Sequence, residues 1–346
     1  MISLANLVTN ALCRANQITN RTLILPLLIF YPTSRCNSRC ISCDWWRSAG
    51  EDDLTLEEIK SLAGCLPGLG TRWVLLSGGE PLLRQDVFDV ARYFRAAGAR
   101  LWLLTSGLYL EKYAEQVARH FSRVTISLDA STAALYRAVR GVDALATVEA
   151  GVRRLKTLAP DLPVTARATL HKTNYRELPH LVDKARAMEL DGLSFLAADV
   201  SSTAFGRTSP PTEDGGLLLS AQEVAEFRSI VEEAATTHQT DFAARFIAED
   251  PAKLRRLPQY YAAMRGADAF PLVTCNAPWV SVVVEADGMV RPCFFHQPLG
   301  SIRHKSLNDI VREDLPAFRR ELDVSTNPIC QRCVCSLKVG LRSNLW

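Results

Sequence analysis

Short apolar runs alternate with amphipathic stretches between residue 23 and about residue 198 of the chain. Runs of this length predict buried strands at Leu23–Tyr31, Trp73–Leu76, Leu101–Leu104, Val124–Leu128, Val164–Leu170 and Leu193–Leu196. Helical periodicity predicts helices between them, at Leu56–Leu66, Val87–Ala97, Glu111–Phe121, Thr147–Leu158 and Leu178–Glu189. Strands joined by crossovers of this length predict a parallel sheet built from right-handed βαβ units.

The pattern changes after residue 198. Residues 199–219 are rich in Ser, Thr, Pro and Gly and predict a long loop, which in a compact domain is a candidate lid. Further helices are expected from Ser220 to about Thr237, at Pro251–Arg265 and at Leu307–Leu322. Asp287 and Gly288 predict a hairpin turn between strands at Trp279–Glu285 and Met289–Cys293. This mixture predicts a separate, smaller α+β unit in the C-terminal third.

These changes divide the chain into four segments. They are an N-terminal extension (1–22), an α/β core (23–198), a loop and helical connection (199–265) and the C-terminal unit (266–346). Thr55 and Glu58 form a capping-box pattern before the first predicted helix, and Gly98 is suited to end the second.

Composition indicates an ordinary globular protein. The 346 residues are 48% hydrophobic and 22% charged, and a net charge of +3 is too small to argue for nucleic acid or an anionic membrane as partner. The apolar run Leu23–Tyr31 is too short for a transmembrane segment, and the first residues lack the features of a signal peptide. We therefore expect a cytoplasmic location, where clustered thiols favour metal over disulfides.

Eight of the ten cysteines fall in two clusters. In the first cluster Cys36, Cys40 and Cys43 directly follow the first predicted strand. Three thiolates can hold three irons of a [4Fe–4S] cluster and leave the fourth iron open. The alternative is a zinc site with a distant fourth ligand. Cys13 and Cys65 match no motif; Cys65 is expected in the core, and no role is assigned to Cys13.

A second motif, Gly78-Gly79-Glu80-Pro81, follows the second predicted strand. Two glycines let the backbone approach a ligand closely, and a carboxylate comes directly after them. Parallel sheets and barrels bind their ligands at this end of the strands.

The two motifs together resemble the radical S-adenosylmethionine (radical SAM) superfamily. The resemblance implies a partial (β/α)6 barrel in which Cys36, Cys40 and Cys43 hold a [4Fe–4S] cluster. In that family the open iron binds the amino and carboxylate groups of SAM. Gly78, Gly79 and Glu80 would then contact the amino end of SAM.

The resemblance also suggests further SAM contacts on other strands. Trp45 would pack on adenine, unless it only fills the barrel mouth, and Arg167 would pair with the SAM carboxylate. Ser127 and Asp129 would lie near the ribose, although such residues at strand ends are often only helix caps. Residues 105–107 are a further candidate lining of the same mouth.

The second cysteine cluster resembles the SPASM/twitch extension of radical SAM enzymes. The full pattern has seven cysteines, whereas this chain has five, so we expect the twitch form with one auxiliary [4Fe–4S] cluster. Its ligands would be Cys275, Cys293, Cys330 and Cys333. Cys335 would be an alternative ligand or a small hydrophobic residue, and a structural zinc ribbon is the alternative to the cluster. His296 and the pair Arg319-Arg320 are interpreted as surface residues.

The resemblance implies an enzyme whose 5′-deoxyadenosyl radical removes a hydrogen atom from the substrate. We favour a small-molecule or lipid substrate, because the segment before residue 23 is too short for the leader-binding domain that peptide-modifying relatives often carry. The auxiliary cluster would transfer electrons in an oxidation or rearrangement, and flavodoxin or ferredoxin would supply electrons. A maturase-like enzyme acting on peptides or proteins and a non-catalytic iron–sulfur protein are the alternatives. No catalytic side chain beyond the cofactor contacts is identified.

Overall fold

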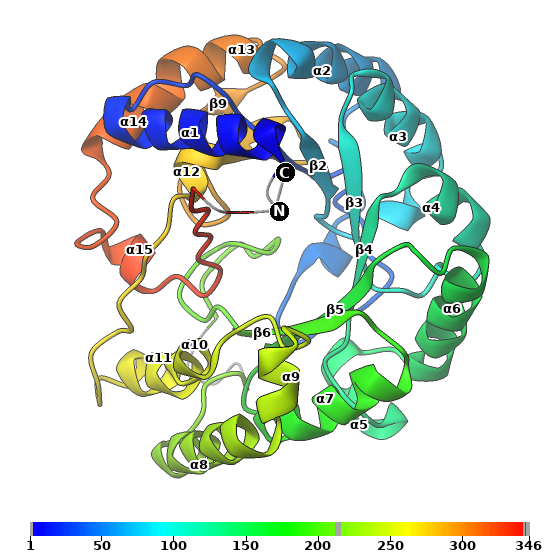
Figure 1. The fold of residues 1–346 in the computed structure, drawn as a ribbon, viewed down its shortest axis with the longest axis vertical. Coiled ribbons are helices and arrows are strands. Elements are labelled where there is room, and N and C mark those ends of the chain that lie inside the picture. The colour runs from blue at the N-terminus through cyan, green and yellow to red at the C-terminus, as the bar shows by residue number, and fades with distance from the viewer. Residues whose placement is uncertain (1–2, 212–215, 342, 344–346) are drawn as a thin grey trace.

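The computed structural model shows one curved sheet lined on its outer side by helices (Figure 1). It describes residues 3–211, 216–341 and 343. The strands are β1 (Leu27–Phe30), β2 (Trp73–Leu76), β3 (Arg100–Thr105), β4 (Arg123–Ser127), β5 (Val164–Leu170), β6 (Gly192–Ala197), β7 (Ser281–Val284), β8 (Met289–Arg291) and β9 (Gly300–Ser301). Their order in the sheet is β6-β5-β4-β3-β2-β1-β7-β8-β9.

All six strands predicted in the core form, and they pair in parallel with their neighbours in sequence. Within the described residues the sheet stays open, with β6 and β9 as its edges. The expected α/β architecture with an incomplete barrel is therefore confirmed. The first strand is shorter than its apolar run, because only Leu27–Phe30 pairs with a neighbour.

The outer layer consists of the crossover helices, which follow the curve of the sheet (Figure 1). They are α2 (Leu56–Leu69), α3 (Val87–Ala96), α4 (Ala114–His120), α5 (Ala133–Arg140), α6 (Leu145–Leu158) and α7 (Leu178–Ala187). The capping box of Thr55 and Glu58 is present at the start of α2. Gly98 lies just beyond α3 with φ of +87°, a conformation that suits glycine at a helix end.

The other helices lie outside the regular alternation. They are α1 (Leu4–Thr19), α8 (Ala221–Thr237), α9 (Gln239–Ala243), α10 (Pro251–Leu254), α11 (Arg256–Met264), α12 (Ala277–Val280), α13 (Leu307–Asp309), α14 (Leu315–Glu321) and α15 (Pro328–Gln331). Short 3₁₀ turns occur at η1 (Trp45–Arg47), η2 (Pro81–Leu83) and η3 (Tyr175–Glu177), and a π-helical turn, η4 (Ile310–Asp314), interrupts the helix predicted at residues 307–322. Helices α1 and α5 were not predicted. No helix in the described ranges combines the length and apolar character needed to cross a bilayer.

The C-terminal third shares the sheet of the core, whereas the sequence predicts a separate unit. Strand β7 pairs in parallel with β1, so that Phe30 lies between Leu76 on one side and Val284 on the other. The pairing leaves no free backbone edge on β1, because hydrogen bonds form on both sides. The predicted hairpin is confirmed: β7 and β8 are antiparallel around Gly288, whose φ is +86°.

Each face of β1 packs against its own cluster of apolar side chains. Leu28 and Phe30 belong to the large core between the sheet and the outer helices. Leu27 and Ile29 belong to a smaller cluster on the inner face, which also contains Cys13 of α1. Both faces of the strand are therefore buried, which explains why its sequence shows no alternation.

Arg319 corrects the sequence interpretation, because its side chain is only 1% exposed. Its guanidinium donates to the carbonyl oxygens of Pro278 and Arg21 and to the hydroxyl of Thr22. The contacts join α14 to the segment that leads into β1. A buried charge is tolerated where several acceptors surround it, and no sequence pattern identifies them.

Candidate active site

A cavity of about 1210 Å³ lies at the carboxyl ends of the core strands. Every residue that the resemblance assigns to the first cluster or to SAM lines it: Cys36, Cys40, Cys43, Trp45, Gly78, Gly79, Glu80, Ser127, Asp129 and Arg167. The fold thus brings together residues from four separate segments at the end of the sheet where parallel sheets bind their ligands.

The cysteine loop, residues 36–43, packs against the end of α5, a contact that was not predicted. The amide of Arg39 donates to the carbonyl of Arg140 at 2.8 Å, and the amide of Ile41 donates to the carbonyl of Val139 at 3.1 Å. Gly141, which ends α5 with φ of +67°, lies so close to this loop that a Cβ there would come within 2.6 Å of Arg39. The last turn of α5 therefore fixes the path of the chain between Cys36 and Cys43.

The three thiols are largely shielded from water. Burial raises the pKa of Cys36 to about 11 and that of Cys43 to about 12. A neighbouring metal ion reverses this preference, because a coordinating thiol loses its proton. In the described part of the chain no three Cys, His, Asp or Glu side chains lie close enough to hold one metal ion. Ligands of a cubic cluster each bind a separate iron, so they need not meet that spacing.

Arg140 is a cavity residue that the sequence analysis missed. Its guanidinium donates to Asp129 at 2.6 Å, and its Nε has no partner in the part of the chain that is described. The guanidinium also lies near Cys40, where its positive charge opposes the rise in the pKa of that thiol caused by burial. Arg140 lies about 100 positions from the cysteines in sequence, so no local motif connects them.

The predicted loop after β6 packs against the cysteine loop. The carbonyl of Phe205 accepts from the amide of Asp44 at 2.9 Å and from the thiol of Cys43 at 3.4 Å. Arg207 pairs with Asp199 at 3.0 Å, both side chains being buried, and also donates to the carbonyl of Ser42. These contacts tie residues 199–207 to one side of the cavity, whereas positions 212–215 of the predicted loop lie outside the described residues.

The Gly-Gly-Glu motif runs along the start of the cysteine loop. Gly79 donates to the carbonyl of Thr33 at 3.1 Å, and the amide of Glu80 donates to the carbonyl of Arg35 at 2.7 Å. A Cβ on Gly79 would lie 2.1 Å from the oxygen of Arg35, and Gly78 has a φ of +94°. Only glycines permit this approach of the two segments.

Glu80 is held in a fixed orientation. Its Oε1 accepts from the hydroxyl of Thr105 at 2.8 Å and from the amide of Leu82 at 3.0 Å, and its Oε2 accepts from the amide of Ser106 at 2.6 Å. Thr105 and Ser106 were expected to line the mouth; they do so and also orient this carboxylate. A carboxylate can accept about four hydrogen bonds, so Glu80 retains capacity for a ligand.

The remaining predicted SAM contacts differ in whether their polar groups already have partners within the protein. Asp129 is occupied: besides Arg140 it accepts from the amide of Thr169 at 2.8 Å. Arg167 donates its Nε to Ser194 at 3.1 Å but forms no ion pair with any described residue. Ser127 lines the cavity, and Trp45 packs edge-on against Tyr31 with ring centres 5.7 Å apart.

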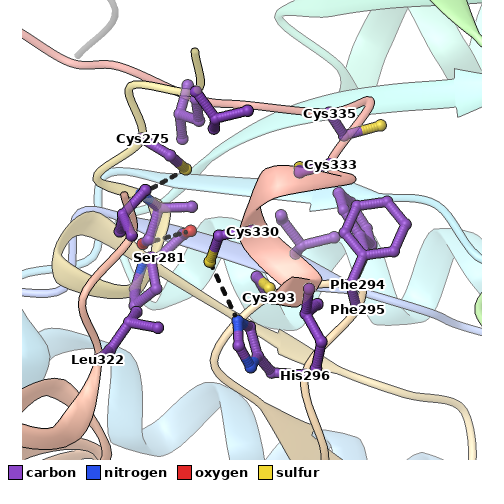
Figure 2. Close-up of a pocket in the computed structure, with 17 residues that line it drawn as sticks. Cys275, Ser281, Cys293, Phe294, Phe295, His296, Leu322, Cys330, Cys333 and Cys335 are labelled. Atoms are coloured by element: carbon purple, nitrogen blue, oxygen red, sulfur yellow. Dashed lines mark hydrogen bonds between the residues drawn. The ribbon is translucent and has the colours of Figure 1, made fainter. Parts of the chain in front are cut away.

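The five C-terminal cysteines line a second cavity of about 630 Å³ (Figure 2). The sulfur atoms of Cys275, Cys293, Cys330 and Cys333 are arranged around one space, whereas that of Cys335 points away from it (Figure 2). The amide of Ala277 lies 3.4 Å from the sulfur of Cys275. Four thiols are the number that a fully ligated cluster needs, and Cys335 stands apart from these four.

His296 was interpreted as a surface residue, and this interpretation is wrong. The ring is buried, packs against Phe318 with ring centres 4.9 Å apart, and its Nε2 lies 3.4 Å from the sulfur of Cys330. Its position three residues after Cys293 was the available sequence signal. Burial lowers the pKa of His296, so the ring favours its neutral form beside the thiol.

Cys335 and Phe294 line both cavities, so these two residues separate the two sites. Phe205, on the loop beside Cys43, contacts Phe295 edge-on at 6.0 Å, and Phe295 contacts Phe294 at 6.3 Å. Aromatic side chains therefore fill the space between the two groups of cysteines.

Comparison with known protein families agrees with this geometry. Residues 30–185 match the radical SAM superfamily, and residues 275–334 match the SPASM iron–sulfur cluster-binding domain. The chain belongs to the radical SAM superfamily. Membership implies SAM and a [4Fe–4S] cluster, and the SPASM match implies further iron–sulfur binding.

Individual radical SAM relatives match different shares of the chain. A GTP 3′,8-cyclase from Caulobacter vibrioides is 38% identical over 169 residues, which are 46% of this chain and 48% of that protein. The match thus spans about half of that relative. An Fe-coproporphyrin III synthase from Methanosarcina barkeri is 26% identical over 93% of this chain and 86% of its own length.

Solved structures of similar fold include SuiB from Streptococcus suis bound to S-adenosylmethionine, with a TM-score of 0.64, 16% identity and coverage of 94% of this chain and 75% of SuiB. Another is anSMEcpe with bound AdoMet, with a TM-score of 0.65, 16% identity and coverage of 87% and 84% of the two chains. At these identities the likeness concerns the fold.

The residues of the first cavity suit the cofactors of the radical SAM superfamily. Three thiols and the unpartnered Nε of Arg140 lie at one end, and Arg167 forms no ion pair among the described residues. Thiolates suit iron, while a guanidinium and a carboxylate suit the two charged groups of an amino acid. In the second cavity, four thiols around one space suit a fully ligated cluster.

Proposed function

We propose that this radical SAM enzyme removes a hydrogen atom from a small-molecule or lipid substrate and uses an auxiliary cluster for electron transfer. The observation that carries the proposal is the single cavity that collects the three cysteines, the Gly-Gly-Glu motif and Arg167. When bound, the reduced cluster and SAM would supply a 5′-deoxyadenosyl radical, and the protein supplies orientation and exclusion of water.

The protein residues divide into two sets around SAM. Cys36, Cys40 and Cys43 would hold the cluster that binds SAM. Glu80, fixed by Thr105 and Ser106, would accept a hydrogen bond from the amino group of SAM. Five further side chains would position SAM: Arg167 at its carboxylate, Trp45 at its adenine, and Ser127 with the Asp129–Arg140 pair near its ribose.

The second cavity supports an oxidative outcome. Cys275, Cys293, Cys330 and Cys333 would complete the shell of one auxiliary cluster, so it has no open iron for substrate. When bound, such a cluster would supply an electron acceptor; loss of a hydrogen atom, one electron and one proton from the substrate amounts to a two-electron oxidation. Phe294 and Cys335 line both cavities, so an electron that passes between the two sites would cross these side chains.

The names of the relatives favour a small molecule over a peptide. Fe-coproporphyrin III synthase matches most of this chain, and GTP 3′,8-cyclase matches about half of it; both names refer to small molecules. SuiB has also been solved with its precursor peptide, but at 15% identity that likeness concerns the fold. We further propose a cytoplasmic enzyme reduced by flavodoxin or ferredoxin, since all ten cysteines are free thiols.

The test is anaerobic reconstitution, iron counting and an assay of 5′-deoxyadenosine formation from SAM under dithionite, with and without candidate substrates. We expect about eight irons per chain and SAM cleavage. The combined substitution Cys36→Ala/Cys40→Ala/Cys43→Ala should lower the count to about four and abolish cleavage. Cys65→Ala, on α2 and away from both cavities, is the matched control and should leave both unchanged. A fully loaded, reduced protein that never cleaves SAM would instead support a non-catalytic iron–sulfur protein.

A further inference from the structure

Helix α1 exposes a continuous apolar face. Leu4, Leu7, Val8 and Ile18 are 77%, 45%, 51% and 70% exposed, and Ala11 is exposed between them. Spacings of three, four and seven residues place all of them along one side of the helix. The side chains therefore form a stripe that runs nearly the whole length of α1.

The opposite side of α1 faces the protein. Thr9, Asn10, Cys13 and Asn16 are buried there, and three of these four side chains are polar. Asn16 donates to the carbonyls of Ile24 at 2.7 Å and Trp279 at 2.8 Å, and its Oδ1 accepts from the amide of Leu23 at 2.8 Å. These contacts fix the rotation of α1, so the apolar stripe cannot turn inward.

The charges around the stripe point to an anionic surface as its partner. The first 43 residues contain no acidic side chain; the first is Asp44. Arg14 is exposed at the margin of the stripe, and Arg21 is exposed just beyond the end of α1. A helix with apolar residues on one side and basic residues at its margin is typical of binding in the plane of a membrane interface.

The size and shape of the stripe disfavour a second copy of the chain. Four exposed side chains on one convex helix offer on the order of 400 Å², whereas a stable protein interface buries about 800 Å² on each partner. A bilayer surface imposes no such minimum, because the helix inserts its apolar side between lipid headgroups.

We propose that α1 docks the protein on an anionic lipid bilayer, with Leu4, Leu7, Val8 and Ile18 inserted at the headgroup boundary. Arg14 and Arg21 lie where they meet the phosphates of the lipid headgroups. The proposal concerns where the enzyme works, and it stands whether or not the proposed reaction is correct.

The test is co-sedimentation of the reconstituted full chain with vesicles of phosphatidylcholine alone or mixed with phosphatidylglycerol. We expect binding to the mixed vesicles and at least tenfold weaker binding to phosphatidylcholine alone. Leu4→Asp/Ile18→Asp should lower binding to the mixed vesicles at least tenfold, and Arg14→Gln/Arg21→Gln should remove the preference for the anionic lipid. Leu158→Asp, an exposed leucine at the end of α6, is the matched control and should bind as the wild type does.

The iron content and the thermal midpoint of each variant show whether the fold is retained. Leu4 and Ile18 are both exposed, so we expect neither quantity to change. The proposal is overturned if the wild type binds neither kind of vesicle. It is also overturned if the Leu4→Asp/Ile18→Asp variant binds the mixed vesicles as well as the wild type does. A wild-type dimer that this variant dissociates overturns it too, because the stripe would then be an interface between copies.

Discussion

Arg140 and Asp129 form a buried ion pair at the floor of the active-site cavity, with Nη1 2.6 Å from Oδ2. The pair connects α5, which supports the cysteine loop, to the end of β4. The guanidinium extends past Asp129 toward Cys40 and keeps an unpartnered Nε within the described structure. A cation at this place favours negative charge on the cysteine sulfurs and on any cluster that they hold.

Replacement of Arg140 should make the SAM-binding cluster harder to reduce. Reduction adds one negative charge, and a nearby buried cation stabilises it, so Arg140→Met should shift the reduction potential to more negative values. Arg140→Lys keeps the charge and should lie closer to the wild type. The measurement is a redox titration followed by electron paramagnetic resonance, with exposed Arg137→Met on the same helix as control.

Arg140→Met also leaves the Asp129 carboxylate buried and unpaired, which can unfold the protein. The double substitution Arg140→Met/Asp129→Asn also removes the negative charge of Asp129, which partly offsets the loss of the cation. It should therefore show a smaller shift of the same negative sign, with full iron content. A potential equal to that of the wild type in both variants would contradict the assigned electrostatic role.

A methyl group at Gly79 should disrupt the cofactor site. In Gly79→Ala the new Cβ would lie 2.1 Å from the carbonyl oxygen of Arg35, so the Gly-Gly-Glu motif and the cysteine loop must separate. We expect SAM affinity, measured by equilibrium dialysis, to fall at least tenfold, with lower iron content. Gly64→Ala is the matched control: it lies in α2, where an added Cβ meets no atom within 4 Å, and should bind SAM normally. An unchanged SAM affinity in Gly79→Ala would contradict this prediction, because the Gly-Gly-Glu motif and the cysteine loop could then separate without weakening SAM binding.

The motifs could be located from the sequence because each occupies a short segment after a predicted strand. Cys36–Cys43 and Gly78–Glu80 follow β1 and β2, and strand order then brings them to one cavity. The residues that hold these motifs in place could not be located from the sequence. Arg140 and Phe205 contact the cysteine loop from about 100 and 160 positions away, and such contacts exist only once the chain is folded.

Cys335 should be dispensable for the auxiliary cluster, whereas Cys333 should be required. The sulfur of Cys335 points away from the space that the other four sulfurs surround (Figure 2), and Cys335 lines the first cavity as well as the second. We expect Cys335→Ser to keep about eight irons per chain and Cys333→Ser to lose up to about four. Iron analysis and Mössbauer spectra of anaerobically reconstituted protein distinguish the two. Equal losses in both variants would make Cys335 a ligand.

Burial of polar side chains was the main failure of the sequence interpretation. His296 and Arg319 were expected at the surface, because charged or titratable residues are seldom buried. Both are enclosed by segments far away in sequence: His296 by Cys330 and Phe318, and Arg319 by carbonyls before β1. Helix α1 was not predicted for a related reason: several of its apolar side chains are exposed, while polar side chains such as Asn10 and Asn16 are buried against the protein.

Stability should fall as the pH drops from about 6.5 toward 4, in part because of His171. The ring is fully buried, its Nδ1 accepts from the amide of Thr173 at 3.2 Å, and its Nε2 has no partner among the described residues. Burial lowers the pKa of His171 from 6.5 to about 4. Between these values the unfolded chain binds a proton that the folded protein does not, so acidification favours unfolding.

The lowered pKa of His171 corresponds to a loss of roughly 1 kcal/mol in the free energy of unfolding between pH 7.5 and pH 5.5. The measurement compares urea midpoints at the two pH values for proteins of equal iron content. His171→Gln should lose that share of the pH dependence, while exposed His180→Gln should behave as the wild type does. If His171→Gln keeps the full dependence, the ring is protonated in the folded protein or other groups control acid unfolding.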